Sequence, residues 1–377
     1  MRMVDLIRAQ QKAKKATPRP AKSASAKAEP EPTPESDEQA AGPPKKNWKV
    51  ALAAPSPPPE EPPIFVPGHV SPSELYAAAE DCLGIIFTAA SRREPFAIEP
   101  AVEMAERLAK AMAKENLQRA PKEPFLRFET LMLQTLGNNS DKRNLAHHGL
   151  NVAIYALKLG DILGYPLMKL TDLALAAALY DIGLTWLPEA IIRKPGPLSE
   201  SERALVQQHP VNSHEILRGL GPTWEWLAEV ALQHHEREDG TGYPKGLSGE
   251  HIHEYAKIIG ICDIYEAMAH ARSNRGAFGP VDVVRQILQT ERGCFSQAIL
   301  KAFINGLSSY PVGSWVRLST KEIGRVIATN KANPLRPVLE VWADASGAKL
   351  PQPRLLDLNK EILLHITGQA TKKALTE

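Results

Sequence analysis

The pattern of hydrophobic and polar residues first predicts a helical body. Apolar residues recur at helical spacing at 75–87, 98–117 and 125–136, and Ser71 is placed to cap the first helix. Helical segments continue to about residue 307, separated by breaks rich in glycine and proline. The fold class expected for this part of the chain is therefore mainly α.

The pattern changes after residue 310. Short runs of β-branched and aromatic residues occur at 315–318, 323–328 and 338–342, with Gly, Asn and Pro between them. Such runs are typical of short antiparallel strands. We expect a small β-rich C-terminal appendage, with one last helix or strand near residues 358–366.

Two helix starts are expected in the middle of the body. Ser199, followed three residues later by Glu202, predicts a capping box for the helix that carries His209. Thr223 is placed to cap the helix that ends at the His234-His235 pair. The expected elements therefore place histidines on separate helices.

The N-terminal part has a different composition. Of 32 prolines, 14 lie between residues 18 and 67, and the basic residues up to Lys27 are followed by an acidic stretch at 29–38. The segment holds too little apolar area to offset the entropy of ordering it. We expect a disordered tail that acts as a solvated linker, with contact to a partner as the alternative.

Composition also excludes some classes of protein. Lys+Arg number 45 against 43 Asp+Glu, so the basic excess of a dedicated nucleic-acid binder is absent. No apolar run approaches the 18 or so residues of a transmembrane helix. The three cysteines, Cys82, Cys262 and Cys294, are too few for a disulfide framework and favour a reducing, cytoplasmic location.

Three histidines are candidate metal ligands. His209, His234 and His235 each follow an apolar residue four positions earlier, which places them on apolar helix faces. A single buried histidine is more often a core residue bonded to the backbone. An adjacent pair with a third on a neighbouring helix is better explained by metal ligation.

Two aspartates fit the same interpretation. Asp181 ends the apolar run 173–180, and Asp263 lies inside the apolar run 258–265. A buried carboxylate is costly unless a cation compensates it; a capping role is reasonable for Asp181 and poor for Asp263. With His148 they complete a His/carboxylate set without thiolates, suited to Fe, Mn, Zn or Co and to hydrolysis.

The segment after the histidine pair resembles a known signature. His234-His235-Glu236-Arg237-Glu238-Asp239-Gly240-Thr241-Gly242-Tyr243-Pro244 is similar to the HD-GYP family, HD-superfamily phosphohydrolases that cleave the bacterial second messenger cyclic di-GMP in signal transduction. The resemblance covers about residues 123–310. It implies an HD-superfamily helical bundle, and the β appendage resembles a tail that often follows this domain.

The resemblance also implies residue roles. It makes six residues ligands of one or two divalent ions, Fe or Mn, with the catalytic aspartate bridging both ions. It places three residues against the cyclic dinucleotide, whose phosphates suit planar guanidinium groups; the alternative for the arginines is a solvated surface pair. The ligands are His148, Asp181, His209, His234, His235 and Asp263, the bridging one being Asp181, and the nucleotide contacts are Tyr243, Arg272 and Arg275.

Three positions depart from the family pattern. Tyr180 replaces the histidine of the His-Asp dyad, Leu184 replaces a lysine, and Asn144 replaces a glutamate that binds a third metal in some members. One ion keeps a nearly complete ligand set, and the other is weakened. Tyr180 could substitute only as a phenolate, which is uncommon for a group whose pKa is about 10.

Three functions compete. The first is a cyclic di-GMP phosphodiesterase-like protein that binds the nucleotide at the metal site and hydrolyses it slowly. The others are a catalytically inactive sensor or partner-docking module, and a phosphohydrolase for another nucleotide. Candidate partners are cyclic di-GMP, a diguanylate cyclase or other signalling protein, and a second copy of the chain as a homodimer; nucleic acid is not expected.

The predicted organisation has four parts. Residues 1–67 form the tail, 68–140 a helical lead-in, 141–308 the HD-GYP-like metal and nucleotide-binding domain, and 309–377 the β appendage. All of the candidate chemistry lies in the third part.

Overall fold

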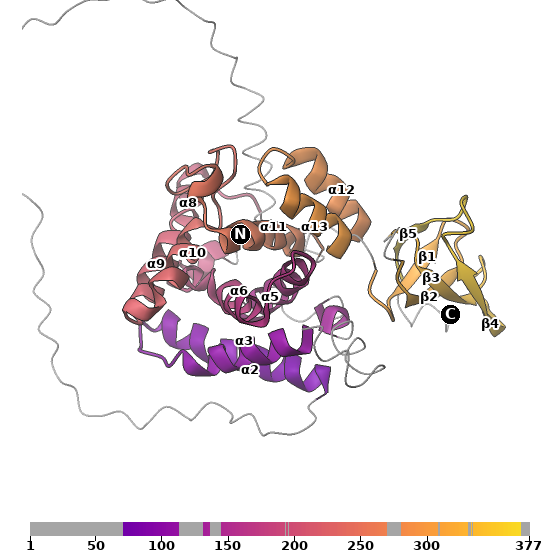
Figure 1. Cartoon of the computed structure of the whole chain (residues 1–377), viewed down its shortest axis with the longest axis horizontal. Helices are drawn as coiled ribbons and strands as arrows, with labels where there is room; N and C mark the ends of the chain where they lie inside the picture. Colours follow the sequence, from indigo (N-terminus) through magenta and orange to yellow (C-terminus); the bar gives the residue numbers. More distant parts are fainter. Residues whose placement is uncertain are drawn as a thin grey trace, which may run out of the picture.

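The computed structural model describes residues 71–112, 131–135, 145–192, 194, 196–269, 280–307, 310–330, 333 and 335–370. The predictions for the N-terminal tail, Asn144, Arg272 and Arg275 lie outside the described residues. Within them, a helical body is followed by a small antiparallel sheet (Figure 1), which confirms the fold class expected for these two parts.

Helices make up the body as far as residue 307. The first described helix is capped by Ser71. The Ser71 hydroxyl accepts a hydrogen bond from the backbone N–H of Glu74, and the Glu74 carboxylate accepts one from the backbone N–H of Ser71. The helices are α2 (Pro72–Ser91), α3 (Glu99–Met112), α5 (Leu145–Ile162), α6 (Leu167–Leu179), η2 (Ile182–Trp186), α7 (Glu189–Ile192), α8 (Glu200–Val206), α9 (His209–Arg218), η3 (Pro222–Trp224), α10 (Glu225–Gln233), η4 (Gly249–His251), α11 (Glu254–Ala269), α12 (Pro280–Thr290) and α13 (Gln297–Leu307).

Helix α5 is central to the body. It packs against α6, α11, α2 and α13, and Figure 1 shows α5 and α6 between the α2–α3 pair and α11. A Cβ on Gly149 would lie 2.5 Å from the carbonyl oxygen of Ala178, so only glycine permits this approach of α5 to α6. The close contact brings His148, which precedes Gly149, next to the C-terminal end of α6. Tyr180 and Asp181 follow directly after this end.

Two helix boundaries differ from the sequence expectations. The capping box of Ser199 and Glu202 is confirmed, but its helix ends at Val206, and His209 instead begins α9. Pro210 explains the break, because proline lacks an N–H and fits only the first turn of a helix. The cap assigned to Thr223 is wrong: Pro222 starts a 3-10 turn that contains Thr223, and α10 begins after it without a side-chain cap.

The C-terminal unit is a five-stranded antiparallel sheet with its own apolar core. The three predicted strands are confirmed, and the last predicted element is a strand that begins at the end of its expected range. The strand at 349–357 was missed because it contains two prolines, which a strand at the edge of a sheet tolerates. In sheet order the strands are β4 (Lys349–Asp357), β3 (Val338–Ala343), β2 (Ile323–Ala328), β1 (Trp315–Leu318) and β5 (Ile366–Gln369).

Two further observations concern the described residues. No helix among them combines the length and the apolar character that crossing a bilayer requires. Cys82, Cys262 and Cys294 are buried, and none of them forms a disulfide bond within the described part of the chain.

Candidate metal centre

The structure brings the six predicted ligands to one place between α5, α6, α9, α10 and α11. Asp181 lies between α6 and η2, and His209 is the first residue of α9. His234 and His235 follow the last turn of α10, and Asp263 lies in the middle of α11. Ligand atoms from these residues and His148 form two groups, each with its atoms within 4.8 Å of one another.

The first group is the three-histidine half of the centre, formed by His209, His234 and His235. Nε2 of His209 lies 3.2 Å from Nε2 of His234 and 3.1 Å from Nε2 of His235. Nδ1 of His209 lies 2.7 Å from the carbonyl oxygen of Val206, and Nδ1 of His234 lies 2.6 Å from that of Ala231. These two rings therefore donate Nδ1–H to the backbone, and their Nε2 atoms are the ring nitrogens that face the other histidines.

Three converging nitrogen lone pairs are the donor set expected around a metal ion. Oδ1 of Asp181 adds a carboxylate, 3.1 Å from Nε2 of His209 and 3.5 Å from Nε2 of His234. Ligands held about 2.1 Å from a common ion lie roughly 3.0–3.4 Å apart, depending on the coordination geometry. The measured separations match this value, so the three-histidine half fits one divalent ion.

Electrostatics in this half keep the buried His235 ready to bind a metal. Burial lowers the pKa of His235 well below its usual value, and His234 and His209 lower it further. A metal ligand must be an unprotonated imidazole. His235 is therefore held in the ligating form.

The second group consists of His148, Asp181 and Asp263, and we call it the tyrosine half because the Tyr180 hydroxyl lies beside His148 and Asp263. The Tyr180 hydroxyl lies 2.7 Å from Nε2 of His148 and donates to Oδ1 of Asp263 at 2.9 Å. Nε2 of His148 is also 3.1 Å from this Oδ1 and 3.8 Å from Oδ2 of Asp181. The tyrosine hydroxyl thus lies between two of the three candidate ligands on this side.

The charges in the tyrosine half differ from those in the three-histidine half. Burial would lower the pKa of His148, but Glu266 and Asp263 raise it well above its usual value. Burial raises the pKa of Tyr180 well above 10, and Asp263 and Asp181 raise it further. Without a metal ion this half therefore favours an imidazolium and a neutral phenol.

Both oxygens of Asp181 and Oδ2 of Asp263 are buried without a hydrogen-bond partner in the part of the chain that the structure describes. Leaving buried carboxylate oxygens unpaired is costly. A cation placed between the two carboxylates removes this cost. The orphaned oxygens are independent support for the fit of the donor set to a metal ion.

Local packing explains how η2 approaches α9. A Cβ on Gly183 would lie 2.3 Å from the carbonyl oxygen of His209, so glycine is required where Asp181 comes close to the histidines. Gly183 also donates its N–H to the Ser213 hydroxyl at 2.9 Å. Leu184, the position of the family's lysine, packs against a small apolar cluster that contains Leu187.

The Gly-Tyr-Pro loop lies against the three-histidine half. The Tyr243 ring stacks on His235 with centroids 4.6 Å apart, and its hydroxyl is buried without a hydrogen-bond partner among the described residues. Glu236 holds the loop, because its carboxylate accepts from the backbone N–H groups of Lys245 at 2.7 Å and Leu247 at 2.9 Å. The nucleotide contact assigned to Tyr243 stays a prediction.

Sequence reasoning missed Glu266 and the anchoring role of Glu236. Oε2 of Glu266 lies 2.6 Å from Nδ1 of His148, so this carboxylate holds the ring that faces the tyrosine half. A signal was present, since Glu266 follows Asp263 by three residues on an apolar helix and therefore lies on the same face. Glu236 directly follows the histidine pair.

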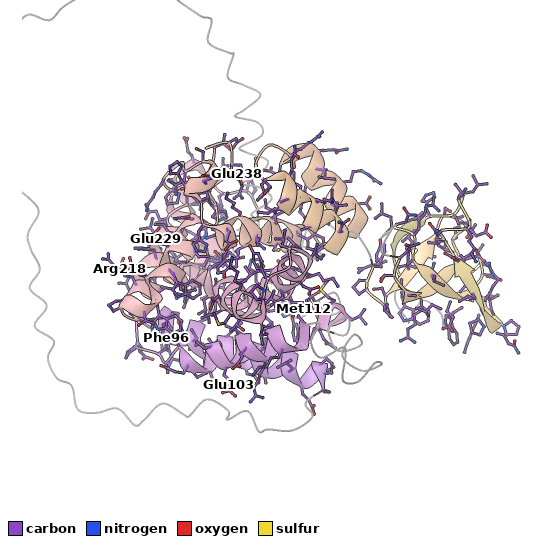
Figure 2. All side chains as sticks on the ribbon, in the orientation of Figure 1. Phe96, Glu103, Met112, Arg218, Glu229 and Glu238 are labelled. Atoms are coloured by element: carbon purple, nitrogen blue, oxygen red, sulfur yellow. The ribbon has the colours of Figure 1, made fainter. Side chains whose placement is uncertain are left out.

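A third group of possible metal ligands lies on the surface and not in this centre. It consists of His214, Glu225 and Glu229. Lys245 lies near Glu229 and Arg218 near Glu225, so basic side chains already balance these carboxylates. Figure 2 shows Arg218 and Glu229 at the outer edge of the helical body.

Comparison with protein families gives two matches. Residues 129–293 match the HD domain, and residues 315–377 match a KOW domain associated with the HD domain. The first segment contains all six predicted ligands, and the second contains the whole C-terminal sheet.

Several curated proteins are similar in sequence. The cyclic di-GMP phosphodiesterase PA4108 of Pseudomonas aeruginosa is 32% identical over 214 residues, covering 56% of this chain and 51% of that protein. The cyclic di-GMP phosphodiesterase response regulator RpfG of Xanthomonas campestris is 36% identical over 134 residues, covering 35% of each chain. The 3'3'-cGAMP-specific phosphodiesterase 1 of Vibrio cholerae is 37% identical over 150 residues, 39% of this chain and 34% of that protein.

The chain spans about half the length, or less, of these curated relatives. Among solved structures, Bd1817, an HDG"Y"P protein from Bdellovibrio bacteriovorus, has 16% sequence identity and a TM-score of 0.48, covering 62% of this chain and 70% of that chain. The domain match shows that residues 129–293 form an HD domain, and the signature at residues 234–244 resembles that of the HD-GYP branch.

Proposed function

We propose that this protein binds cyclic di-GMP at a His/Asp metal centre and hydrolyses it slowly. The observation that carries the proposal is the contrast within one centre. The three-histidine half has converging ligand atoms, whereas in the tyrosine half the hydroxyl of Tyr180 lies 2.7 Å from Nε2 of His148 and 2.9 Å from Oδ1 of Asp263.

One ion would be held by His209, His234, His235 and Asp181. An ion that bound both His148 and Asp263 would require the Tyr180 hydroxyl to move away or to become a ligand itself. The high pKa of Tyr180 disfavours the phenolate needed for ligation. We therefore propose one firmly held ion per chain, Fe or Mn, with a second position of low affinity.

A divalent ion, when bound, acts as a Lewis acid toward a phosphoryl oxygen and lowers the pKa of water. The protein's residues set the conditions for this chemistry. Asp181 lies between the two halves, and Tyr180 fixes Oδ1 of Asp263 by donating a hydrogen bond. Leu184 supplies no positive charge where the family has a lysine, which removes a group that could stabilise negative charge on the phosphate.

Measuring metal content and turnover on the same sample tests the proposal. The full chain is reconstituted with Fe(II) or Mn(II), its ion content is determined by mass spectrometry, and linear and mononucleotide products of cyclic di-GMP are quantified. We expect about one ion per chain, calorimetric binding of the nucleotide and slow hydrolysis that Asp181→Ala abolishes. Two tightly bound ions with rapid turnover would contradict the damaged-dyad proposal.

Two other functions of the same metal centre are alternatives to slow hydrolysis of cyclic di-GMP. An inactive sensor or partner-docking module would bind cyclic di-GMP without forming any product. Hydrolysis of another cyclic dinucleotide is supported by the Vibrio cholerae relatives named as 3'3'-cGAMP-specific. The same assay with 3'3'-cGAMP and cyclic di-AMP separates these alternatives, because each predicts a different product pattern.

The location, the partners and the domain boundaries expected from the sequence are part of the proposal. The three buried thiols, none of them in a disulfide bond among the described residues, support a reducing, cytoplasmic location. A diguanylate cyclase or other signalling protein, and a second copy of the chain, stay candidate partners. The domain boundaries after residues 67, 140 and 308 also stay predictions.

A further inference from the structure

Helix α2 precedes the segment that matches the HD domain, yet it makes polar contacts with the helix that carries His148. The Tyr76 hydroxyl donates to Oδ1 of Asn151 at 2.6 Å and lies 3.2 Å from Nδ1 of His147. Glu80, one turn further along α2, has Oε1 3.5 Å from the same Nδ1. Tyr76, Asn151 and His147 are buried, so these contacts lie inside the body.

The contacts continue from Asn151 to the metal centre. Nδ2 of Asn151 donates to Oε1 of Glu266 at 3.3 Å, and Oε2 of Glu266 lies 2.6 Å from Nδ1 of His148. Because the Tyr76 O–H donates to the amide oxygen, it fixes the orientation of Asn151 and directs the amide NH₂ toward Glu266. Tyr76 therefore acts on Glu266 through Asn151.

Glu266 in turn determines which edge of the His148 ring faces the centre. With Nδ1–H bonded to the carboxylate, Nε2 points toward Tyr180 and Asp263. Carboxylate partners of this kind orient histidine ligands in metal sites and raise their basicity. The same carboxylate has one oxygen for Asn151 and the other for His148, so loss of one bond frees the second to rotate.

We propose that Tyr76, Asn151 and Glu266 are positioning residues for His148, so that α2 completes the metal centre from outside the matched HD-domain segment. The inference rests on the proposed role of His148 in that centre. A purely structural role for Tyr76 makes a different prediction: its loss would lower stability without changing the environment of the His148 ring.

Histidine NMR on the full-length, metal-free protein separates these two roles. With ¹⁵N-labelled histidine, the His148 Nδ1–H resonance is assigned by its loss in His148→Gln. Tyr76→Phe removes the hydroxyl and keeps the ring, and Tyr155→Phe is the matched control, because Tyr155 is also buried and donates to Thr135 at 2.9 Å. We expect Tyr76→Phe to shift or split the His148 resonance and Tyr155→Phe to leave it in place.

The position of each residue in the chain of contacts predicts the order of the effects. Glu266→Gln should move the His148 resonance most, Asn151→Leu less, and Tyr76→Phe least but still beyond the control. An unchanged His148 resonance in Tyr76→Phe, with the melting temperature lowered as in the control, would overturn the proposal. If Tyr76→Phe does not fold, Asn151→Leu is judged by the same criterion.

This test uses neither metal nor nucleotide. A protein that fails to bind or hydrolyse cyclic di-GMP would contradict the proposed function and leave the His148 result as it stands. Conversely, a His148 resonance that does not change in Tyr76→Phe would overturn the positioning role of α2 and leave the proposed function as it stands.

Discussion

In the three-histidine half of the centre, three imidazole nitrogens face one another directly, whereas in the tyrosine half a hydroxyl lies between His148 and Asp263. The three-histidine half is buried, the tyrosine half is buried except for the partly exposed His148, and both contact Asp181. The difference arises from one side chain, Tyr180, which supplies its own hydrogen bonds where a histidine would offer a ligand. A buried cluster can therefore be satisfied in two ways, by an ion or by internal hydrogen bonds.

The largest expected effect comes from removing a ligand of the three-histidine half. His234→Ala should weaken binding of Mn(II) by at least about 100-fold, because even partners outside the ligand shell typically change metal affinity by about 10- to 100-fold. Mass spectrometry of the purified protein and Mn(II) titration measure the loss. His214→Ala is the control, since His214 lies in the surface group near Glu229.

The comparison would be broken if His234→Ala kept its ion while Asp263→Asn lost it. That result would place the firmly held ion in the tyrosine half. It would also leave the converging Nε2 atoms without an explanation.

The next effect sharpens the comparison by converting one half into the other. Tyr180→His with Leu184→Lys should raise the metal content from about one ion to about two per chain and increase cyclic di-GMP turnover about 10- to 100-fold, because a ligand for the second ion and a positive charge return. Tyr180→Phe is the matched control, since it removes the hydroxyl without adding a ligand. Equal metal content in the double variant and in the parent protein would show that Tyr180 does not limit the second position.

A smaller effect is expected in the pH dependence of the metal-free protein. The pKa of His235 is lowered, by burial and by His234, and the pKa of His148 is raised by Glu266 and Asp263 against the effect of burial. His235 should therefore stay neutral at pH 6, and His148 should stay protonated above pH 7. Titration of the histidine C–H resonances by NMR measures both.

The two shifts have opposite consequences for stability. The contribution of His235 is present above the unfolded pKa of about 6.5 and is lost as the pH falls toward its lower folded value. The contribution of His148 is present below about 6.5 and is lost as the pH rises through its raised value. Two histidines that both titrate near 6.5 would show that the halves do not differ electrostatically.

The smallest expected effect concerns the loop beside the three-histidine half. Tyr243→Phe removes a buried hydroxyl that has no hydrogen-bond partner among the described residues, so the free energy of unfolding should rise by about 1 kcal/mol. If this hydroxyl contacts the nucleotide, calorimetry should show cyclic di-GMP affinity lowered about 5- to 10-fold, the value of one hydrogen bond. An unchanged affinity would remove Tyr243 from the predicted nucleotide contacts.

Much of the fold was predictable because local signals decide local structure. The capping pairs at Ser71 and Ser199 begin helices as expected, and three β-branched runs form strands. The errors occurred where two local rules competed. The capping box at Ser199 predicted one helix that includes His209, but Pro210 lies in the first turn of a new helix, so the segment is divided into two.

The candidate site was predictable in its members and not in its geometry. Buried acids and paired histidines on apolar helices are costly, so their presence in the sequence already indicated a shared cation. Glu266 was missed because its spacing of three residues from Asp263 indicates a shared helix face but does not indicate which side chain it contacts. Its role depends on a partner 118 residues earlier in the chain.

The sequence by itself determined which donor atoms this protein has, that the dyad histidine is a tyrosine, and where helices and most strands lie, because these follow from residue type and short-range spacing. Only the tertiary structure decided that the Tyr180 hydroxyl lies between His148 and Asp263, and that α2 reaches the centre through Tyr76 and Asn151. Hydrogen bonds depend on distances of a few tenths of an ångström between atoms on different helices, and these distances are set by how the helices pack.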